Sequence, residues 1–383
     1  MRIYFDNAAT TPLDERVITV MSDTMRELYG NPSSIHAEGR QVRALIERAR
    51  KTIANALNAS IGEIFFTSGG TESNNMALKC AVRDLGVQRV ISSPLEHHCV
   101  LHTLDRLKAA GVAVEYVRVG ACGTVDYDHL ETLLQTGDTK TLVSLMHANN
   151  EIGTLLDLER TAALCDTYGA FLHSDTVQTV GHYPIDVDAL NIQFLSGAAH
   201  KFHGPKGVGF IYINGNHLIQ PFIDGGAQER NMRGGTENVY GIAGMAKAIE
   251  LAYAELDERR AKIKELRTYM RERLTERFEG LAFNGAEQAL YTVLSVSFPP
   301  SANTDMLLLS LDIAGISASG GSACSSGSDT GSHVIQALDQ DPTRKTIRFS
   351  FSHLNTREEV DRVVAELVQL LPAAQAQPAR TLA

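Results

Sequence analysis

Four apolar runs of the sequence end in side chains that can do chemistry. The first is IFFTSGGTESNN, in which a Gly-Gly turn and Thr71 precede an expected helix. Gly70 and Thr71 would then offer N–H groups and the positive end of a helix dipole to a phosphate. A plain helix cap supplied by Thr71 is the simpler alternative.

The other three runs are followed by amides, a carboxylate and a lysine. TLVSLMH leads to Asn149, Asn150 and Glu151; AFLHSD ends at Asp175 and is followed by Gln178; SGAAHKFHGPKG contains Lys201. An aspartate in this place is often a helix N-cap, and a loop lysine is usually solvated. A lysine among small apolar residues can instead lose its proton and attack an aldehyde.

These groups match the needs of pyridoxal 5'-phosphate (PLP). Its aldehyde requires a lysine, its ring nitrogen requires a carboxylate to keep its proton, and its phosphate requires N–H donors. Because ligands bind beyond the carboxyl ends of parallel strands, we expect Lys201, Asp175 and the Gly70–Thr71 turn to share one edge of a sheet.

The segment SSPLEHHC offers His97, His98 and Cys99 beside Glu96. Zinc binding is one interpretation, although adjacent residues rarely converge on one ion. A histidine at a strand end can also stack on a flat cofactor ring and move protons near neutral pH.

A Gly- and Ser-rich run surrounds one cysteine. Residues Ser317 to Ser332 read SASGGSACSSGSDTGS, with Cys324 near the middle. Gly and Ser bury little apolar surface and are costly to order, so we expect this loop to be mobile and Cys324 to be exposed. An exposed thiol there favours nucleophilic or redox chemistry.

Short β-branched or aromatic runs alternate with helical stretches from about residue 40 to 240. Strands are expected at Glu63 to Thr67, Arg89 to Ser92, Val112 to Val119, Thr141 to His147, Phe171 to Ser174, Asn191 to Leu195 and Gly209 to Ile213. This rhythm predicts an α/β fold with a mainly parallel seven-stranded sheet covered by helices.

The region after about residue 240 predicts a second, smaller α+β domain. Tyr240 to Phe278 consists almost entirely of helix-forming residues. The charges of its second half indicate either a helix with a solvated face or a coiled coil. Two strand candidates and a helix ending near Leu371 follow. We therefore predict a large domain at 13–252 and a small domain at 253–383 that also includes residues 1–12 and carries Cys324.

Composition narrows the class of protein. With 35 basic and 45 acidic residues in 383, the net charge of −10 argues against direct nucleic-acid binding. Five scattered cysteines without CxxC spacing disfavour disulfides and structural zinc and fit a reducing compartment. Since no apolar run is long enough to span a bilayer, we expect a cytoplasmic protein without membrane contact.

The ordered motifs resemble those of the cysteine desulfurases, the NifS/IscS-like enzymes among the PLP-dependent class-V aminotransferases. The similarity extends from about Tyr4 to Asn355. It is carried by DNAATTP, GNPSSIH, FTSGGTESNN, HANNEIG, HSDTVQ, HKFHGPKGVG, QERNMRGGTENV and GGSACSSG. The resemblance implies the aspartate-aminotransferase-like fold and removal of sulfur from L-cysteine, which leaves L-alanine.

The resemblance also assigns roles to residues. Lys201 would bind the PLP aldehyde, Asp175 the ring nitrogen and Gln178 the phenolic oxygen, while His97 would stack on the ring. The phosphate would be held by Gly70, Thr71 and His200, and by Thr236 of a neighbouring subunit, which implies a homodimer. Asn150, also expected at the cofactor, and Arg348 would bind the substrate carboxylate.

Cys324 would take the sulfur as a persulfide and pass it to a protein acceptor, such as a scaffold for Fe–S cluster assembly. No resident metal is implied; Cys324 would contact an Fe–S cluster only during transfer. A selenocysteine lyase or other β-eliminating PLP enzyme, and a sulfur-relay protein without turnover, remain alternatives.

The sequence departs from the family pattern at several positions. Ala198 stands where Ser is usual, SDTGSHV follows the cysteine where LEPSHVL is usual, and Ser352 and His353 stand where Gly and Arg are usual. The C-terminal extension that binds scaffold proteins in some members is not recognisable in AAQAQPARTLA. The sequence leaves the acceptor and its pathway open.

Overall fold

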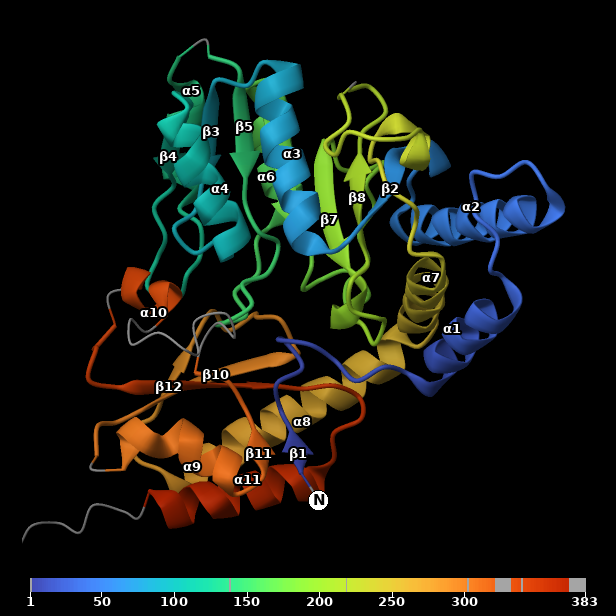
Figure 1. Ribbon diagram of the computed structural model, residues 1–383. Helices are drawn as coiled ribbons and strands as arrows, with labels where there is room; N and C mark the ends of the chain where they lie inside the picture. Colours follow the sequence, from blue (N-terminus) through green and yellow to red (C-terminus); the bar gives the residue numbers. More distant parts are fainter. Residues whose placement is uncertain are drawn as a thin grey trace, which may run out of the picture.

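A seven-stranded, mainly parallel sheet forms the centre of the larger part of the molecule (Figure 1). The computed structural model describes residues 2–137, 139–217, 219–301, 303–320, 332–338 and 340–371. The strands are β2 (Ile64–Thr67), β3 (Arg89–Ser92), β4 (Ala113–Tyr116), β5 (Thr141–Ser144), β6 (Phe171–Asp175), β7 (Phe194–Ala198) and β8 (Gly209–Ile213). Their order is β2-β8-β7-β6-β5-β3-β4, which confirms the predicted fold class.

The strand directions decide where the functional residues meet. Strands β4, β3, β5, β6 and β7 pair in parallel, while β8 is antiparallel to both β7 and β2. The two reversals give β2 the same direction as β7. The carboxyl ends of β2, β5, β6 and β7 therefore lie at one edge of the sheet, as the sequence predicted.

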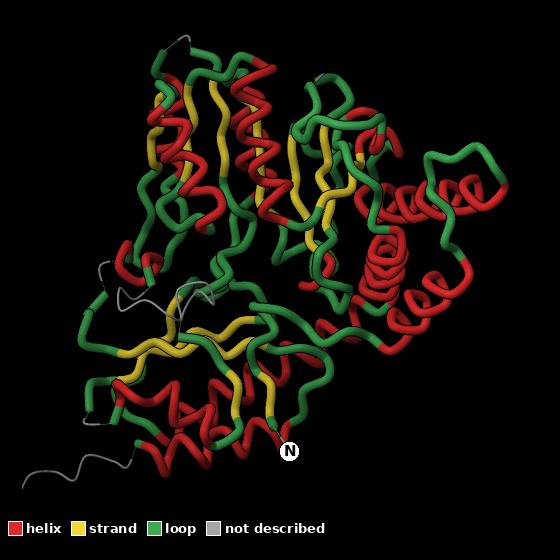
Figure 2. The backbone as a smooth tube through the Cα atoms, in the orientation of Figure 1, coloured by secondary structure: helices red, strands yellow, loops and turns green. Residues whose placement is uncertain are grey.

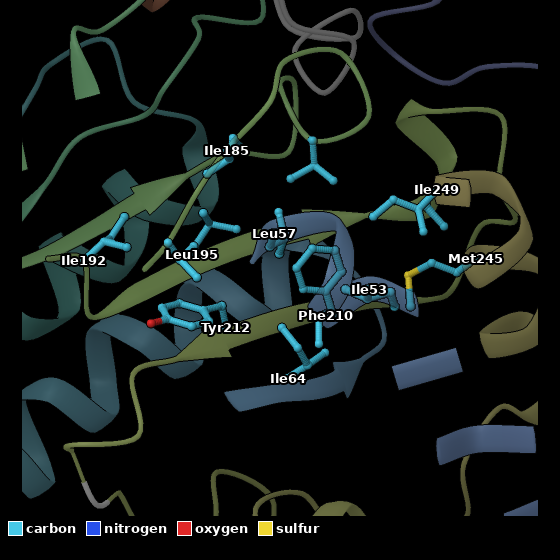
Figure 3. Close-up of a cluster of buried hydrophobic side chains, with 14 of the residues drawn as sticks. Ile53, Leu57, Ile64, Ile185, Ile192, Leu195, Phe210, Tyr212, Met245 and Ile249 are labelled. Atoms are coloured by element: carbon cyan, nitrogen blue, oxygen red, sulfur yellow. The ribbon is translucent and has the colours of Figure 1, made fainter. Parts of the chain in front are cut away.

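Helices cover both faces of this sheet. They are α1 (Glu15–Glu27), α2 (Ala37–Leu57), α3 (Gly70–Leu85), α4 (His98–Ala109), α5 (Tyr127–Gln135), α6 (Leu158–Thr167) and α7 (Val239–Ala254). One core joins α2 and α7 to the sheet through residues such as Ile53, Leu195 and Met245 (Figure 3). A second core packs α3 and α4 against the opposite face through Met76, Leu104 and other residues.

A smaller α+β unit follows α7. It contains the sheet β12-β10-β9 and a parallel pair formed by β1 and β11. The strands are β1 (Ile3–Tyr4), β9 (Ala282–Asn284), β10 (Val293–Phe298), β11 (Ile316–Ser317) and β12 (Lys345–Ser350); the helices are α8 (Leu256–Arg277), α9 (Leu307–Ile313), α10 (His333–Ala337) and α11 (Arg357–Leu370). Buried side chains of α8 and α11, including Leu266 and Val363, pack with Phe298 to form its core.

Four short 3-10 helices complete the described elements: η1 (Ile61–Glu63), η2 (Ala199–Lys201), η3 (Gln228–Asn231) and η4 (Thr304–Met306). The helical region after residue 240 is two helices, with the break at Glu255. The division into domains at residue 252 stays a prediction. Every helix in the described ranges is too short or too polar to traverse a lipid bilayer.

The expected strand Asn191 to Leu195 was placed too early, because β7 runs from Phe194 to Ala198. Its second half consists of small residues, which the sequence pattern assigns to a loop. All five strand residues are buried. A Cβ atom on Gly197 would lie 2.3 Å from the ring of Phe210 on β8, so the small residue is required by close strand packing.

Candidate active site

One cavity collects most of the predicted site residues at the carboxyl edge of the sheet. Its volume is about 240 Å³. It is lined by Ala8, Ala9, Gly70, Thr71, Asn74, His97, Cys99, Met146, Asn150, Asp175, Val177, Gln178, Ala198, His200, Lys201 and Arg348. Figure 2 shows how the loops that follow the strands gather between the large sheet and the smaller unit.

Lys201 lies in η2, directly after β7. Its Nζ donates hydrogen bonds to the carbonyl oxygens of Ala8 at 2.6 Å and Ala9 at 2.8 Å. These carbonyls belong to the DNAATTP segment, which the chain brings in from its N-terminus. Two backbone acceptors therefore hold the amine at the cavity wall, within reach of an aldehyde bound there.

Asp175 is the last residue of β6 and is held by a network of donors. Its Oδ2 accepts from Asn74 Nδ2 at 2.6 Å, and its Oδ1 accepts from the Val177 N–H at 3.0 Å. Asn74 Oδ1 lies 3.1 Å from Nε2 of His173, whose pKa burial lowers to about 4. Donors on both oxygens fix the orientation of the carboxyl group at the cavity wall, where a pyridine nitrogen could reach it.

His97 caps helix α4, and this fixes its hydrogen-bonding pattern. Its Nδ1 accepts from the Cys99 N–H at 3.2 Å. The pKa of His97 is lowered, chiefly by burial, although Asp175 opposes the shift. A neutral ring whose Nδ1 accepts must carry its proton on Nε2. His97 therefore offers a neutral ring with one N–H donor.

The N-terminus of α3 forms the side of the cavity where the sequence predicted phosphate binding. The helix begins at Gly70, so Thr71 lies in its first turn and is not the cap that the sequence suggested. Gly69 has φ 150°, a conformation that side chains disfavour. A Cβ atom on Gly70 would lie 2.6 Å from Val177 Cγ2. Glycines thus let the helix N–H groups approach an anion closely.

Gln178 and His200 complete the polar lining. Gln178 Nε2 donates to the Ala8 carbonyl at 3.0 Å. His200 Nδ1 lies 3.2 Å from Thr10 Oγ1. Burial, followed by the charges of Lys201 and Lys206, lowers the pKa of His200 to about 4. His200 is therefore neutral at physiological pH and offers an anion a hydrogen bond rather than a full charge.

Arg348 reaches the cavity from β12 of the smaller unit and is only 1% exposed. Its Nη1 donates to the Asn150 carbonyl at 2.9 Å and its Nη2 to Asp6 Oδ1 at 2.8 Å. Its buried Nε has no partner among the described residues. A buried guanidinium whose N–H donors are not all used within the protein is suited to binding a carboxylate.

One predicted residue does not line this cavity, and another is not among the described residues. Thr236 lines a separate cavity of about 140 Å³, together with Arg233 and Glu237. Cys324 lies outside the described residues. That it is exposed on a mobile loop stays a prediction. The zinc interpretation of His97, His98 and Cys99 finds no support, because no group of metal-ligating side chains was found in the described ranges.

Sequence reasoning missed the roles of Cys99, Asn74 and Asp6. Cys99 was considered as a possible zinc ligand and not as part of a cofactor site, yet it lines the cavity and its Sγ lies 3.1 Å from His97 Nδ1. Its position two residues after His97 was the only signal for it. Asp6 and Asn74 were quoted within motifs without a role, since their partners are distant in sequence.

The departures from the family pattern have distinct surroundings. Ala198 is buried and lines the cavity, so no hydroxyl is available at that point. The ring of His353 packs 4.6 Å from the ring of His203, at an interplanar angle of 68°. Position 353 therefore joins the smaller unit to the segment that follows Lys201.

The chemistry of the cavity fits PLP. An amine, a carboxyl group, a neutral imidazole, a side-chain amide and a helix N-terminus surround one cavity. These are the groups that the aldehyde, ring nitrogen, ring face, phenolic oxygen and phosphate of PLP each require. A larger cavity of about 1010 Å³, lined in part by α2 and α6, contains none of the predicted site residues.

Comparisons with known proteins agree with this chemistry. Residues 3–363 match the model of the aminotransferase class-V family. A curated relative from Dictyoglomus turgidum, named cysteine desulfurase IscS, is 43% identical over 374 residues, covering 96% of this chain and 94% of the relative. A relative from Bacillus subtilis, named putative cysteine desulfurase IscS 1, is 40% identical and covers 97% of this chain and 99% of the relative.

A solved structure described as a NifS-like protein superposes with a TM-score of 0.90 at 38% identity, and the match covers 97% of this chain and 99% of that one. Family model, relatives and structure span nearly the whole length and agree with the motifs read from the sequence. The chain therefore belongs to the aminotransferase class-V family and, within it, to the cysteine desulfurases.

Proposed function

We propose that this chain is a PLP-dependent cysteine desulfurase that converts L-cysteine to L-alanine and forms a persulfide on Cys324. The observation that carries the proposal is the convergence of Lys201, Asp175 and Arg348, from three separate elements, on one cavity. A further solved structure, described as SspA in complex with cysteine, has 31% identity and a TM-score of 0.79, covers 93% of this chain and 100% of that one, and supports the substrate.

Each predicted site residue of the cavity has one task in this proposal. Lys201 would bind the aldehyde, Asp175 would hold the proton on the ring nitrogen, and Gln178 would bind the phenolic oxygen. His97 would cover the ring. Gly70, Thr71 and His200 would bind the phosphate. When bound, PLP supplies an electron sink that stabilises negative charge at the substrate α-carbon.

The substrate and the nucleophile complete the reaction. Arg348 and Asn150 would bind the α-carboxylate, which orients the amino acid in the cavity. The Cys324 thiolate would form an S–S bond with the substrate sulfur as the C–S bond breaks. The carbon product would take up a proton and leave as L-alanine, so that one thiol and one cysteine give one persulfide and one alanine.

The assembly and acceptor follow from the same assignment. Thr236 lies away from this chain's own cavity, which fits a role at the phosphate of a second copy in a homodimer. The acceptor would be a protein, such as an Fe–S scaffold. Among the described residues Cys80, Cys99, Cys122 and Cys165 are all free thiols, which fits a cytoplasmic location.

The proposal is tested by incubating the purified, PLP-loaded protein with L-cysteine and a reductant. With the reductant we expect sulfide and L-alanine in equal amounts; without it, we expect one added sulfur atom on the Cys324 peptide by mass spectrometry. Cys324→Ala should abolish both, whereas Cys122→Ala, which removes an exposed cysteine outside the cavity, should not.

Two results would overturn the proposal. Full desulfurase activity in Cys324→Ala would remove the nucleophile from the mechanism. Turnover of L-selenocysteine but not of L-cysteine would identify a selenocysteine lyase instead. Lys201→Ala supplies a separate check, because borohydride should then no longer fix PLP to the chain.

A further inference from the structure

One carboxylate oxygen of Asp6 joins Arg348 to Ser319. Asp6 Oδ1 accepts a hydrogen bond from Arg348 Nη2 at 2.8 Å and a second from Ser319 Oγ at 2.7 Å. Ser319 and Arg348 also pair through their backbones: the Arg348 N–H donates at 2.7 Å and the Ser319 N–H donates at 3.3 Å. The three residues therefore form one connected unit.

This unit joins segments that are far apart in the sequence. Asp6 belongs to the N-terminal segment, which Figure 1 shows passing between the large sheet and the smaller unit. Arg348 lies on β12, and Ser319 follows β11 by two residues. In the sequence, Ser319 stands five positions before Cys324. Asp6 thus contacts both the cavity-lining arginine and the chain that leads to the proposed nucleophile.

The charge balance of the unit depends on Arg348. Its guanidinium has five N–H donors in all, of which Nη1 and Nη2 each use one on Asn150 and Asp6. When a substrate carboxylate also binds to this guanidinium, the positive charge of Arg348 is divided between two carboxylates. The negative charge on Asp6 Oδ1 is then less fully neutralised by Arg348. The hydrogen bond that Asp6 Oδ1 accepts from the Ser319 hydroxyl therefore becomes stronger.

We propose that Asp6 is a positioning residue that orients Arg348 for the substrate α-carboxylate and couples carboxylate binding to Ser319. The proposal rests on the proposed function for the identity of the substrate. It assigns Asp6 no contact with substrate or cofactor. Its action is through Arg348 on one side and through Ser319 on the other.

The first test separates orientation from charge. Asp6→Ala should raise the KM for L-cysteine about 10- to 100-fold, the loss expected for one charge-assisted hydrogen bond, with a smaller effect on kcat. Asp6→Asn keeps an oxygen that accepts from both donors and should restore KM to within about threefold of the original. Bound PLP, measured by its absorbance, should stay unchanged in both variants.

The second test measures the coupling without turnover. L-alanine binding to the PLP-loaded protein is followed by the change in PLP absorbance. Ser319→Ala should weaken L-alanine about two- to fivefold in the original protein but not in the Asp6→Ala background, because coupled residues are not additive. Asp361→Ala is the matched control, since Asp361 Oδ1 also accepts from a hydroxyl, that of Tyr269, and a guanidinium, that of Arg273, outside the cavity.

Several results would overturn the inference. One is an unchanged KM and unchanged L-alanine affinity in Asp6→Ala; another is an equal effect of Ser319→Ala in both backgrounds. If Asp6→Ala does not fold, an unchanged L-alanine affinity in Ser319→Ala alone refutes the coupling. A protein that releases no alanine from L-cysteine refutes the proposed function, whereas the amino-acid affinities still decide the role of Asp6.

Discussion

At the level of single residues, the thiols of Cys99 and Cys122 lie in different environments, because Cys99 is partly buried and Cys122 is exposed. Cys99 lies in the cavity wall, where its Sγ accepts from Asn74 Nδ2 at 3.3 Å. Burial, reinforced by the negative charge of Asp175, raises the pKa of Cys99 to about 12. Since the thiolate is the nucleophile, we expect Cys99 to be unreactive at neutral pH although its Sγ lies 3.1 Å from His97 Nδ1.

This difference predicts the alkylation pattern. At neutral pH Cys99 should react with iodoacetamide at least about 1000-fold more slowly than an ordinary exposed thiol, whose pKa is near 8.5. The exposed Cys122 is the internal reference. Mass spectrometry of the digested protein gives both rates, and the Cys99 rate should rise about tenfold per pH unit above neutrality. Equal rates for the two cysteines would contradict the proposed environment.

At the scale of elements, one buried ion pair joins α2, β2 and the segment that contains Thr236. Arg50 on α2 and Glu229 on η3 are 2% and 3% exposed and are joined by two hydrogen bonds, of 2.7 and 2.9 Å. Glu229 Oε2 also accepts from the Phe66 N–H at 2.7 Å. Glu229, Arg230 and Asn231 all have positive φ values, so side-chain contacts must hold this backbone in place.

Breaking this pair should be costly. Arg50→Met leaves the Glu229 carboxylate buried without its cation, and we expect a loss of about 3–5 kcal/mol in the free energy of unfolding. Urea unfolding measures it. The matched control is Arg2→Met, which breaks the ion pair with Asp312 where both side chains are 62% exposed, and which should cost less than about 1 kcal/mol. Equal losses of unfolding free energy in the two variants would show that the buried ion pair does not stabilise the fold more than an exposed one.

The elements differ in how well their sequences predict them. Arg89–Ser92 and Gly209–Ile213 were predicted with their observed bounds, because apolar runs between turn residues are a local signal. β7 was not, because its Gly197 is dictated by the ring of Phe210 on another strand. The site shows the same contrast: Lys201 and Asp175 follow local patterns, whereas Asp6 acquires its role only from contacts with residues more than 300 positions away.

For the whole molecule, buried histidines predict acid sensitivity. Burial lowers the pKa of His147, His173 and His182 to about 4 in the folded state, against about 6.5 in an unfolded chain. The unfolded state therefore binds more protons between these values. Stability should be unaffected by these groups above about pH 6.5 and fall as pH drops towards 4, by on the order of 1–2 kcal/mol per histidine at about pH 5.

Urea unfolding midpoints across this range check the expectation. His147→Gln removes one of the three titrating rings. The loss of stability between about pH 6.5 and 4.5 should therefore be smaller in this variant by the contribution of one histidine. A midpoint that stays constant from about pH 6.5 to 4.5 would show that these rings are not kept neutral by the fold.

The position of the N-terminal segment has a consequence for synthesis of the chain. Ile3 pairs with Ile316, Asn7 donates to the Ser350 carbonyl, and the carbonyls of Ala8 and Ala9 accept from Lys201. Residues 3 and 7 therefore leave the ribosome long before their partners at positions 316 and 350. Since domains fold as their residues emerge, a nascent chain can build the large sheet early, but the candidate cavity is complete only after the β12 strand with Arg348 has emerged.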